Sequence, residues 1–273
     1  MDYPDFPFRS PISYTHHSKV LEYLHDYAAH FNLLPCIRFQ QTLLKISRVE
    51  NGDNIKSGWL VKVLNQQTEQ VENHHFDVIV LSPGRYSAPN WPSLEGLNLF
   101  AGSVIHSHDY RFREPYIDKR KVVVIGAGPS GIDMALDVAS VATEVIFLNR
   151  SVTNFSSSNL PVNVRQVRGE IHRFTGPFSV SAKILEENGE ETFAEFEEVD
   201  GVILATGYRL STLGFLDLKS CGLVWNENED TVEGIYRHLI NISQPSMALL
   251  SVSKPTLSFP LYHQQVSFLS STF

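Results

Sequence analysis

The chain has 273 residues, of which 42% are hydrophobic and 19% charged, so a packed globular core is expected rather than a disordered chain. A formal net charge of −8, without a long basic run, argues against nucleic acid as a partner. The two cysteines, Cys36 and Cys221, lie far apart, which argues against a disulfide scaffold, a C-x-x-C redox centre or a cysteine zinc site. No stretch approaches the roughly 18 apolar residues that span a bilayer, and residues 1–8 lack the features of a signal peptide. We therefore expect a protein of a reducing, cytoplasmic compartment.

The first part of the chain is typical of a loop, a helix and several strands. Residues 1–15 are rich in proline and aromatic residues and are expected to form a loop packed on another element. Apolar residues at helical spacing predict a helix over 17–34. Alternating apolar residues predict strands over 37–49 and 59–64, and a continuous apolar run predicts a buried strand over 77–81.

The most informative stretch follows at residues 121–148, where a strand, a glycine turn, a helix and a second strand are expected. The β-branched run from Val122 to Ile125 predicts a buried strand. The next residues form a G-x-G-x-x-G pattern, and apolar residues at helical spacing come after it. A second apolar strand over 144–148 closes a βαβ unit of about 30 residues.

Glycines in this turn have a chemical purpose in dinucleotide-binding proteins. One allows the tight turn, one lets a pyrophosphate approach the backbone, and one lets the helix pack close to the strand. The anion then binds the unpaired N–H groups at the positive end of the helix. The pattern predicts a dinucleotide site, with a tight turn of purely structural purpose as the alternative. The predicted site residues of the turn are Gly126, Ala127, Gly128, Pro129, Ser130 and Gly131.

The end of the second strand indicates which nucleotide is bound. An NAD site usually has Asp or Glu there for the ribose 2′-hydroxyl, whereas a cation suits a 2′-phosphate. Here the chain has Asn149, Arg150 and Ser151 and no carboxylate. Arg150 can form a forked, charge-assisted pair with phosphate, and its two neighbours can add hydrogen bonds. The pattern favours NADP(H) over NAD, with an ordinary solvated arginine as the alternative.

Two strand ends resemble each other on either side of this βαβ unit. Residues 77–84 and 200–207 each contain an acid, an apolar strand, two small or turn residues and a glycine. In open α/β sheets, ligands bind at the carboxyl ends of strands. We therefore include Gly84, Thr206 and Gly207 among the cofactor-binding residues and predict two nucleotide-binding modules, one inserted in the other.

A further motif lies just before the glycine turn. It has the form F-x-G-x-x-x-H-x-x-x-Y and comprises Phe100, Gly102, His106 and Tyr110. This motif resembles the identifying motif of the flavin-containing monooxygenases, whose Baeyer–Villiger relatives usually carry Trp in place of Tyr110. Further segments similar to that family are 3–8, 20–24, 205–208 and 259–262.

The resemblance implies an α/β flavoprotein with two dinucleotide-binding domains. A Rossmann-like NADP module over 116–212 is expected to be inserted in an incomplete FAD module, formed by residues 1–115 and 213–273. FAD and NADP(H) are the implied cofactors, and the backbone of Leu43 is expected to contact FAD.

The resemblance also implies an activity. NADPH reduces FAD, O₂ adds to the reduced flavin to form a C4a-hydroperoxide, and a soft nitrogen or sulfur atom of a small amine or sulfide takes the distal oxygen. Bound NADP⁺ shields that adduct from water. Because the flavin carries the chemistry, no catalytic side chain is expected. A cytoplasmic location is implied, with peripheral association with the endoplasmic reticulum as an alternative.

The histidines of the motif have two interpretations. His106 and His108 form an H-x-H pair that could ligate a metal, but no third ligand is visible nearby, so no metal site is expected. We instead expect His106 to hydrogen-bond to the backbone where the two modules join.

The chain departs from the family in one respect. The family begins with its own FAD-binding G-x-G-x-x-G, whereas the only such pattern here begins at Gly126. Roughly 60 residues, about the size of a βαβ unit with its following strand and loop, are expected to be missing. They would include an active-site asparagine of the family. The alternative function is therefore a catalytically silent NADP-binding remnant.

Overall fold

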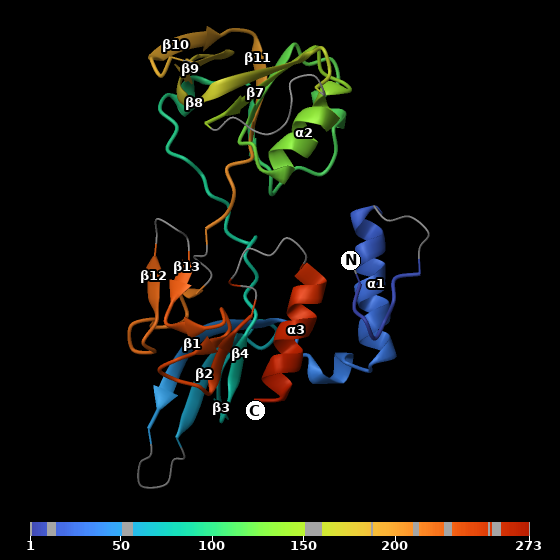
Figure 1. Cartoon of the computed structure of the whole chain (residues 1–273), viewed down its shortest axis with the longest axis vertical. Coiled ribbons are helices and arrows are strands. Elements are labelled where there is room, and N and C mark those ends of the chain that lie inside the picture. Colours follow the sequence, from blue (N-terminus) through green and yellow to red (C-terminus); the bar gives the residue numbers. More distant parts are fainter. Residues whose placement is uncertain are drawn as a thin grey trace. The chain divides into compact units, whose positions relative to one another are not determined.

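The computed structural model shows two compact units. It describes residues 2–9, 15–50, 57–150, 160–186, 188–209, 213–226, 231–250, 252 and 258–272. One unit comprises residues 1–85 and 210–273, and the other comprises residues 86–209 (Figure 1). The second unit is therefore an insertion in the first. Within the described residues, no helix is long and apolar enough to cross a membrane.

The boundary between the two compact units, at residues 85 and 86, lies before the expected module boundary at residue 115. Strand β5 (Ser103–His106) pairs in parallel with β11 (Val199–Leu204), and this pairing places the segment from residue 86 onward in the second unit. The partners are about a hundred residues apart in sequence, so no local pattern indicates that they meet. Which cofactor each unit binds stays a prediction.

The second unit is built on a seven-stranded sheet of order β10-β9-β8-β7-β6-β11-β5. Neighbouring strands are parallel from β5 through β11, β6 and β7 to β8, whereas the pairs β8–β9 and β9–β10 are antiparallel. Helix α2 connects β6 to β7 as the sequence predicts. The bounds are β6 (Lys121–Ile125), α2 (Pro129–Ala139), β7 (Glu144–Asn149), β8 (Val164–Gly176), β9 (Ser179–Leu185) and β10 (Glu191–Phe196), with short 3₁₀ helices η2 (Leu97–Leu99) and η3 (Glu114–Tyr116).

The apolar run in β6 is explained by burial on both faces of the sheet. Val122 and Val124 pack with Val138 of α2 on one face, whereas Val123 packs with Phe174 of β8 on the other. A central parallel strand covered on both sides has no solvent face, so its sequence is continuously apolar rather than alternating.

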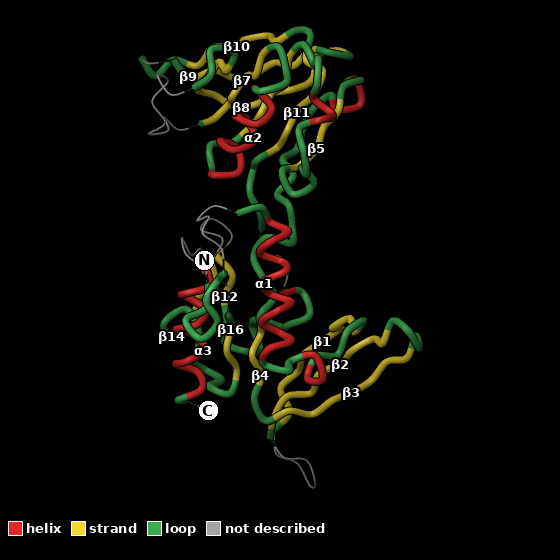
Figure 2. The backbone as a smooth tube through the Cα atoms, turned by 90° about the vertical axis from the view of Figure 1, so that its right-hand side faces the viewer, coloured by secondary structure: helices red, strands yellow, loops and turns green. Residues whose placement is uncertain are grey.

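The first unit contains smaller sheets. Strands β1, β2 and β3 form an antiparallel meander (Figure 2), and β4 pairs in parallel with β16 in a four-stranded sheet of order β14-β15-β16-β4. The bounds are β1 (Gln41–Val49), β2 (Gly58–Asn65), β3 (Gln70–Phe76), β4 (Ile79–Leu81), β12 (Val224–Asn226), β13 (Thr231–Glu233), β14 (Ile235–Tyr236), β15 (Ile240–Asn241) and β16 (Met247–Leu249). Trp59 is fully buried in the hydrophobic core of the first unit, and its indole N–H donates to the Ser246 hydroxyl at 3.0 Å. Among the described strands, β4 is an edge strand, and its Val80 is 45% exposed.

The helices of the first unit are α1 (His17–His30), η1 (Leu34–Cys36) and α3 (Ser258–Ser270). Helix α1 ends four residues before the predicted end because Asn32 adopts a left-handed conformation with φ 49°. The amino-terminal segment packs on α1, as expected: the Tyr23 hydroxyl donates to the Phe6 carbonyl at 2.6 Å. It also accepts from the Tyr3 amide at 2.8 Å. The ring of Tyr3 stacks on Phe259 of α3 at 4.8 Å.

Candidate nucleotide-binding site

The glycine turn after β6 is shaped by close backbone contacts. Gly126 has φ +106°, and a Cβ there would overlap the Ala205 carbonyl oxygen. A Cβ on Gly131 would overlap the Gly126 carbonyl oxygen, so this glycine lets α2 approach the turn. Gly128 differs, because no atom of the described residues, apart from its two chain neighbours, lies within 4 Å of its Cβ position. Backbone packing therefore explains the first and third glycines, whereas the second faces open space.

Helix α2 begins directly after this open position. Gly128 is the N-cap residue and Pro129 follows it, and no side chain caps the first turn. The N–H groups of a first turn have no partner inside the helix, and the helix dipole places partial positive charge there. The amino end of α2 therefore offers an anion-binding position beside free space.

A cavity of about 570 Å³ adjoins this turn. Its walls come from the carboxyl ends of β6, β7 and β11 and from β8, the edge at which open α/β sheets bind ligands. Among the predicted site residues, those that line it are Gly126, Ala127, Asn149, Arg150 and Thr206. Gly128, Pro129, Ser130 and Gly131 begin α2 next to it, and Ser151 lies outside the described residues.

The end of β7 supplies a buried polar group with no partner. Asn149 is 4% exposed, and its Nδ2 atom has no hydrogen-bond partner among the described residues. An unpaired buried donor costs about 1–3 kcal/mol. An acceptor atom of a ligand in the cavity would remove that cost. The neighbouring Arg150 is exposed at the cavity wall.

Two charged residues at this cavity were not predicted. Glu170 of β8 lines the cavity because β8 pairs with β7. In that pairing, Arg168 of β8 lies opposite Asn149 of β7, and Glu170 follows two residues later. Arg209 lines it from the segment after β11, and its Nε atom donates to the Asn90 side-chain oxygen at 2.7 Å. The only sequence signal for Arg209 was its position just after Thr206 and Gly207.

Comparison with known proteins identifies the family. The family model described as flavin-binding monooxygenase-like matches residues 1–160, more than half of the chain.

The chain belongs to this flavin-binding monooxygenase-like family.

Relatives with curated names support the same assignment. The chain is 28% identical to flavin-containing monooxygenase FMO GS-OX3 of Arabidopsis thaliana, over 98% of this chain and 56% of the relative. It is 26% identical to senecionine N-oxygenase of Tyria jacobaeae, over 86% of this chain and 47% of the relative. The chain thus spans about half the length of the curated relatives it matches.

Solved structures show the same fold. S-allyl-L-cysteine S-oxygenase from Allium sativum superimposes with a TM-score of 0.78 at 24% identity, covering 99% of this chain and 59% of that one. Tmm from Pelagibacter gives a TM-score of 0.78 at 21% identity, covering 100% and 59%. The architecture is that of a flavoprotein with two dinucleotide-binding domains, and FAD and NADP(H) are the cofactors of the family.

The F-x-G-x-x-x-H-x-x-x-Y motif forms β5 and the residues on either side of it. Phe100 packs on Phe174 at 4.7 Å, and a Cβ on Gly102 would lie 2.6 Å from the Phe100 ring. His106 is fully buried, its Nδ1 atom accepts from the His108 amide at 3.0 Å, and burial lowers its pKa. Tyr110 bonds to α2. No group of three potential metal ligands occurs among the described residues.

Thr206 and Gly207 form a junction with the segment before β5. The Thr206 hydroxyl donates to the Asn90 carbonyl at 2.6 Å, and the Asn90 amide donates to the Gly207 carbonyl at 2.9 Å. The Thr206 proton is thus committed to the backbone, which leaves only acceptor capacity for a ligand. Gly207 has φ +80°, a conformation that favours glycine.

The two predicted FAD contacts lie in the first unit. Leu43 is in β1 next to a register shift and packs on the unit's core. Gly84 follows β4 with φ +71°, and in the described part of the chain only its two neighbours come within 4 Å of its Cβ position. The next residue, Arg85, is buried and donates to the Val252 carbonyl at 2.6 Å. Gly84 therefore offers open backbone in the loop that follows β4.

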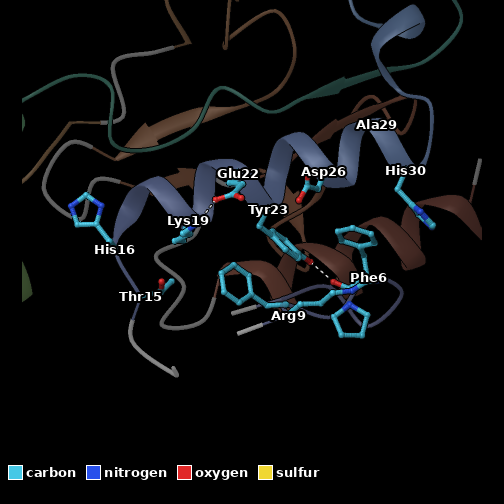
Figure 3. Close-up of a pocket in the computed structure, with 12 residues that line it drawn as sticks. Phe6, Arg9, Thr15, His16, Lys19, Glu22, Tyr23, Asp26, Ala29 and His30 are labelled. Atoms are coloured by element: carbon cyan, nitrogen blue, oxygen red, sulfur yellow. Dashed lines mark hydrogen bonds and ion pairs between the residues drawn. The ribbon is translucent and has the colours of Figure 1, made fainter. Parts of the chain in front are cut away.

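A second hollow of about 750 Å³ lies between residues 6–9 and α1 (Figure 3). Tyr23 and Phe6 provide aromatic walls, and Lys19 pairs with Glu22 at 2.7 Å on the helix. Among its described lining residues, cations and carboxylates balance and no glycine turn is present. It therefore lacks the anion-binding character of the cavity beside α2.

Proposed function

We propose that the chain serves an NADPH- and O₂-dependent flavin monooxygenase reaction, with NADP(H) bound in the cavity beside Gly128. The observation that carries the proposal is the combination at that cavity. The first turn of α2 has no side-chain cap, Gly128 faces open space, and the buried Nδ2 atom of Asn149 has no partner. These absences are those of the described residues, and they suit a ligand that carries phosphate and hydrogen-bond acceptors.

Each residue of the cavity has a distinct proposed part. The first turn of α2 would receive the pyrophosphate, and Gly128 would allow its close approach. Asn149 would donate to an acceptor of the adenosine ribose, and Arg150 would pair with the 2′-phosphate. Gly126 and Gly131 would act indirectly, because their contacts hold the turn and helix together.

Flavin would supply hydride acceptance and oxygen activation when bound. Toward it, the chain offers the backbone of Leu43 and the open position at Gly84 in the first unit. The names of the relatives, an N-oxygenase and an S-oxygenase, support a small-molecule substrate with a soft nitrogen or sulfur atom.

A second candidate is nucleotide binding without oxygenation. The chain has a single G-x-G-x-x-G, and it belongs to the second unit. In the first unit, β4 is followed three residues later by Gly84, and the next residue, Arg85, donates to the Val252 carbonyl. No glycine turn leading into a helix is present in the described part of that unit to hold a flavin pyrophosphate.

One experiment separates the two candidates. The purified chain is titrated with NADPH, then incubated with excess FAD, desalted, and assayed for bound flavin and for NADPH oxidation with a tertiary amine or a thioether. Near-stoichiometric flavin with substrate-dependent turnover supports the monooxygenase. NADPH binding by a colourless protein supports the second candidate, and absence of NADPH binding contradicts both.

A further inference from the structure

The last turn of α2 is tied to the segment that follows β5. The Tyr110 hydroxyl donates to Asp137 Oδ2 at 2.7 Å, and Arg113 Nη1 lies 3.2 Å from Asp137 Oδ1. Arg113 also donates to the hydroxyl of Ser140, the C-cap residue of α2, at 3.1 Å. Each carboxylate oxygen of Asp137 thus has its own donor. We call Tyr110, Arg113 and Asp137 the helix clamp.

The helix alone does not favour this arrangement. A carboxylate in the last turn opposes the helix dipole, and α2 has no basic residue in that turn. The cation comes instead from Arg113, outside the helix. Burial and the neighbouring Asp137 carboxylate both raise the pKa of Tyr110, so its hydroxyl keeps its proton and stays a donor. Asp137 is therefore an attachment point rather than a helix-stabilising residue.

The clamp is anchored in the core of the second unit. The Tyr110 ring stacks on Tyr116 with centroids 6.0 Å apart and an interplanar angle of 20°. Tyr116 is 3% exposed and packs with Val122, Val124 and Ile203 of the sheet. The carboxyl end of α2 is consequently fixed to the same strands that carry the glycine turn.

We infer that Tyr110 and Arg113 are positioning residues for NADP(H), because they fix the helix whose first turn receives the pyrophosphate. The inference rests on the proposed function. Helix α2 has 11 residues, a length of roughly 16 Å, and its amino end is held by the contact of Gly131 with Gly126. A helix released at one end can tilt, and the N–H groups of its first turn then lose their alignment. Binding groups work only when their supports hold them within about 0.5 Å.

The pyrophosphate is common to NADPH and NADH, which gives the test its signature. In the full chain, Tyr110→Phe and Arg113→Gln are each expected to raise the Kd of both nucleotides by the same factor, about 3- to 10-fold. Arg150→Ala should instead affect NADPH alone. Titration calorimetry with each nucleotide, alongside thermal unfolding, measures both quantities.

Arg120→Gln is the matched control. Arg120 pairs with Asp200 at 2.7 Å and with Glu198 at 3.1 Å in the same unit, and it precedes β6 at the end away from the glycine turn. Its loss should lower the Tm without changing either Kd. Asp137→Ala should raise both Kd values as Tyr110→Phe and Arg113→Gln do. Adding Tyr110→Phe to Asp137→Ala should produce no further loss of affinity.

Unchanged Kd values in Tyr110→Phe and Arg113→Gln would overturn the inference while the wild type still binds NADPH. The inference would also be wrong if Arg120→Gln lost as much affinity as the clamp variants for the same fall in Tm. The loss of affinity would then come from general destabilisation of the protein. Failure of the wild type to bind NADPH would instead refute the proposed function on which the inference depends.

Discussion

The two units reach their folds in different ways. The second unit is continuous, and its central strands β6 and β7 are buried on both faces by residues of that same continuous segment. The first unit is assembled from both ends of the chain, and its parallel pair β4–β16 joins residues about 170 positions apart. Local pattern therefore determines much of the second unit, whereas the first depends on contacts that only the completed chain provides.

The largest expected effect contrasts two glycines of the second unit. Gly128→Val should abolish NADPH binding, because its side chain would fill the space proposed for the pyrophosphate. The Tm should change little, since none of the described residues occupies that space. Titration with NADPH and thermal unfolding test this.

Gly131→Ala is the control for Gly128→Val, because it is expected to lower stability. Its methyl group would overlap the Gly126 carbonyl oxygen, so it should lower the free energy of unfolding by about 1–3 kcal/mol. If folded Gly128→Val protein binds NADPH as well as the wild type does, the proposed pyrophosphate position is wrong.

A core substitution tests whether the two units are energetically separate. Trp59→Ala removes a fully buried ring from the first unit and should destabilise that unit by about 3–5 kcal/mol. NADPH affinity should persist, because the cavity belongs to the second unit. Denaturant unfolding followed by far-UV circular dichroism and by nucleotide binding measures the two responses, and a parallel loss of both would contradict independence.

Arg150 provides a smaller effect that concerns nucleotide choice. Arg150→Ala should weaken NADPH roughly 10- to 100-fold, as expected for a charged hydrogen bond, and leave NADH nearly unchanged. Competition between the two nucleotides gives the ratio. Equal losses would indicate that Arg150 supports the fold rather than the 2′-phosphate.

The smallest effect is a pH dependence at the opposite end of the same sheet. Hydrogen bonding to Arg120 lowers the pKa of Asp200 below its usual value of 3.8. A depressed folded-state pKa contributes stability that is present above pH 3.8 and is lost as pH falls through the lower value. Because Arg120 is half-exposed, the contribution should be small. Tm measured between pH 5 and 3 should fall less in Arg120→Gln than in the wild type, and identical pH profiles would contradict the assignment.

The parts of the second unit that could be predicted share a local physical cause. The continuous apolar run at Val122–Ile125 indicates burial on two faces, and the following glycines indicate a close turn into a helix. Both features are local and need no knowledge of distant residues. The strand β5 could not be placed in this way, because its partner β11 is specified only by the completed sheet.

The candidate site shows the same division. Asn149 and Arg150 could be selected because they end a predicted strand, but the unpaired Nδ2 atom of Asn149 is a property of packing. Glu170 and Arg209 enter the cavity through β8 and through the bond to Asn90, which no short motif encodes. The helix predicted over 17–34 is shorter in the structure for a local reason, because Asn32 adopts a left-handed conformation.

The exposed edge at β4 has a practical consequence for every experiment above. Among the described strands, β4 has no partner on its outer side, and such an edge presents backbone donors and acceptors to an extended peptide. Val78 and Val80 add apolar side chains that are 38% and 45% exposed. Concentrated solutions of this chain should therefore form oligomers through strand addition, with a light-scattering signal that rises with protein concentration. Val80→Lys would place a charge on that strand and suppress the oligomers. This variant is therefore the suitable background in which to measure nucleotide affinities.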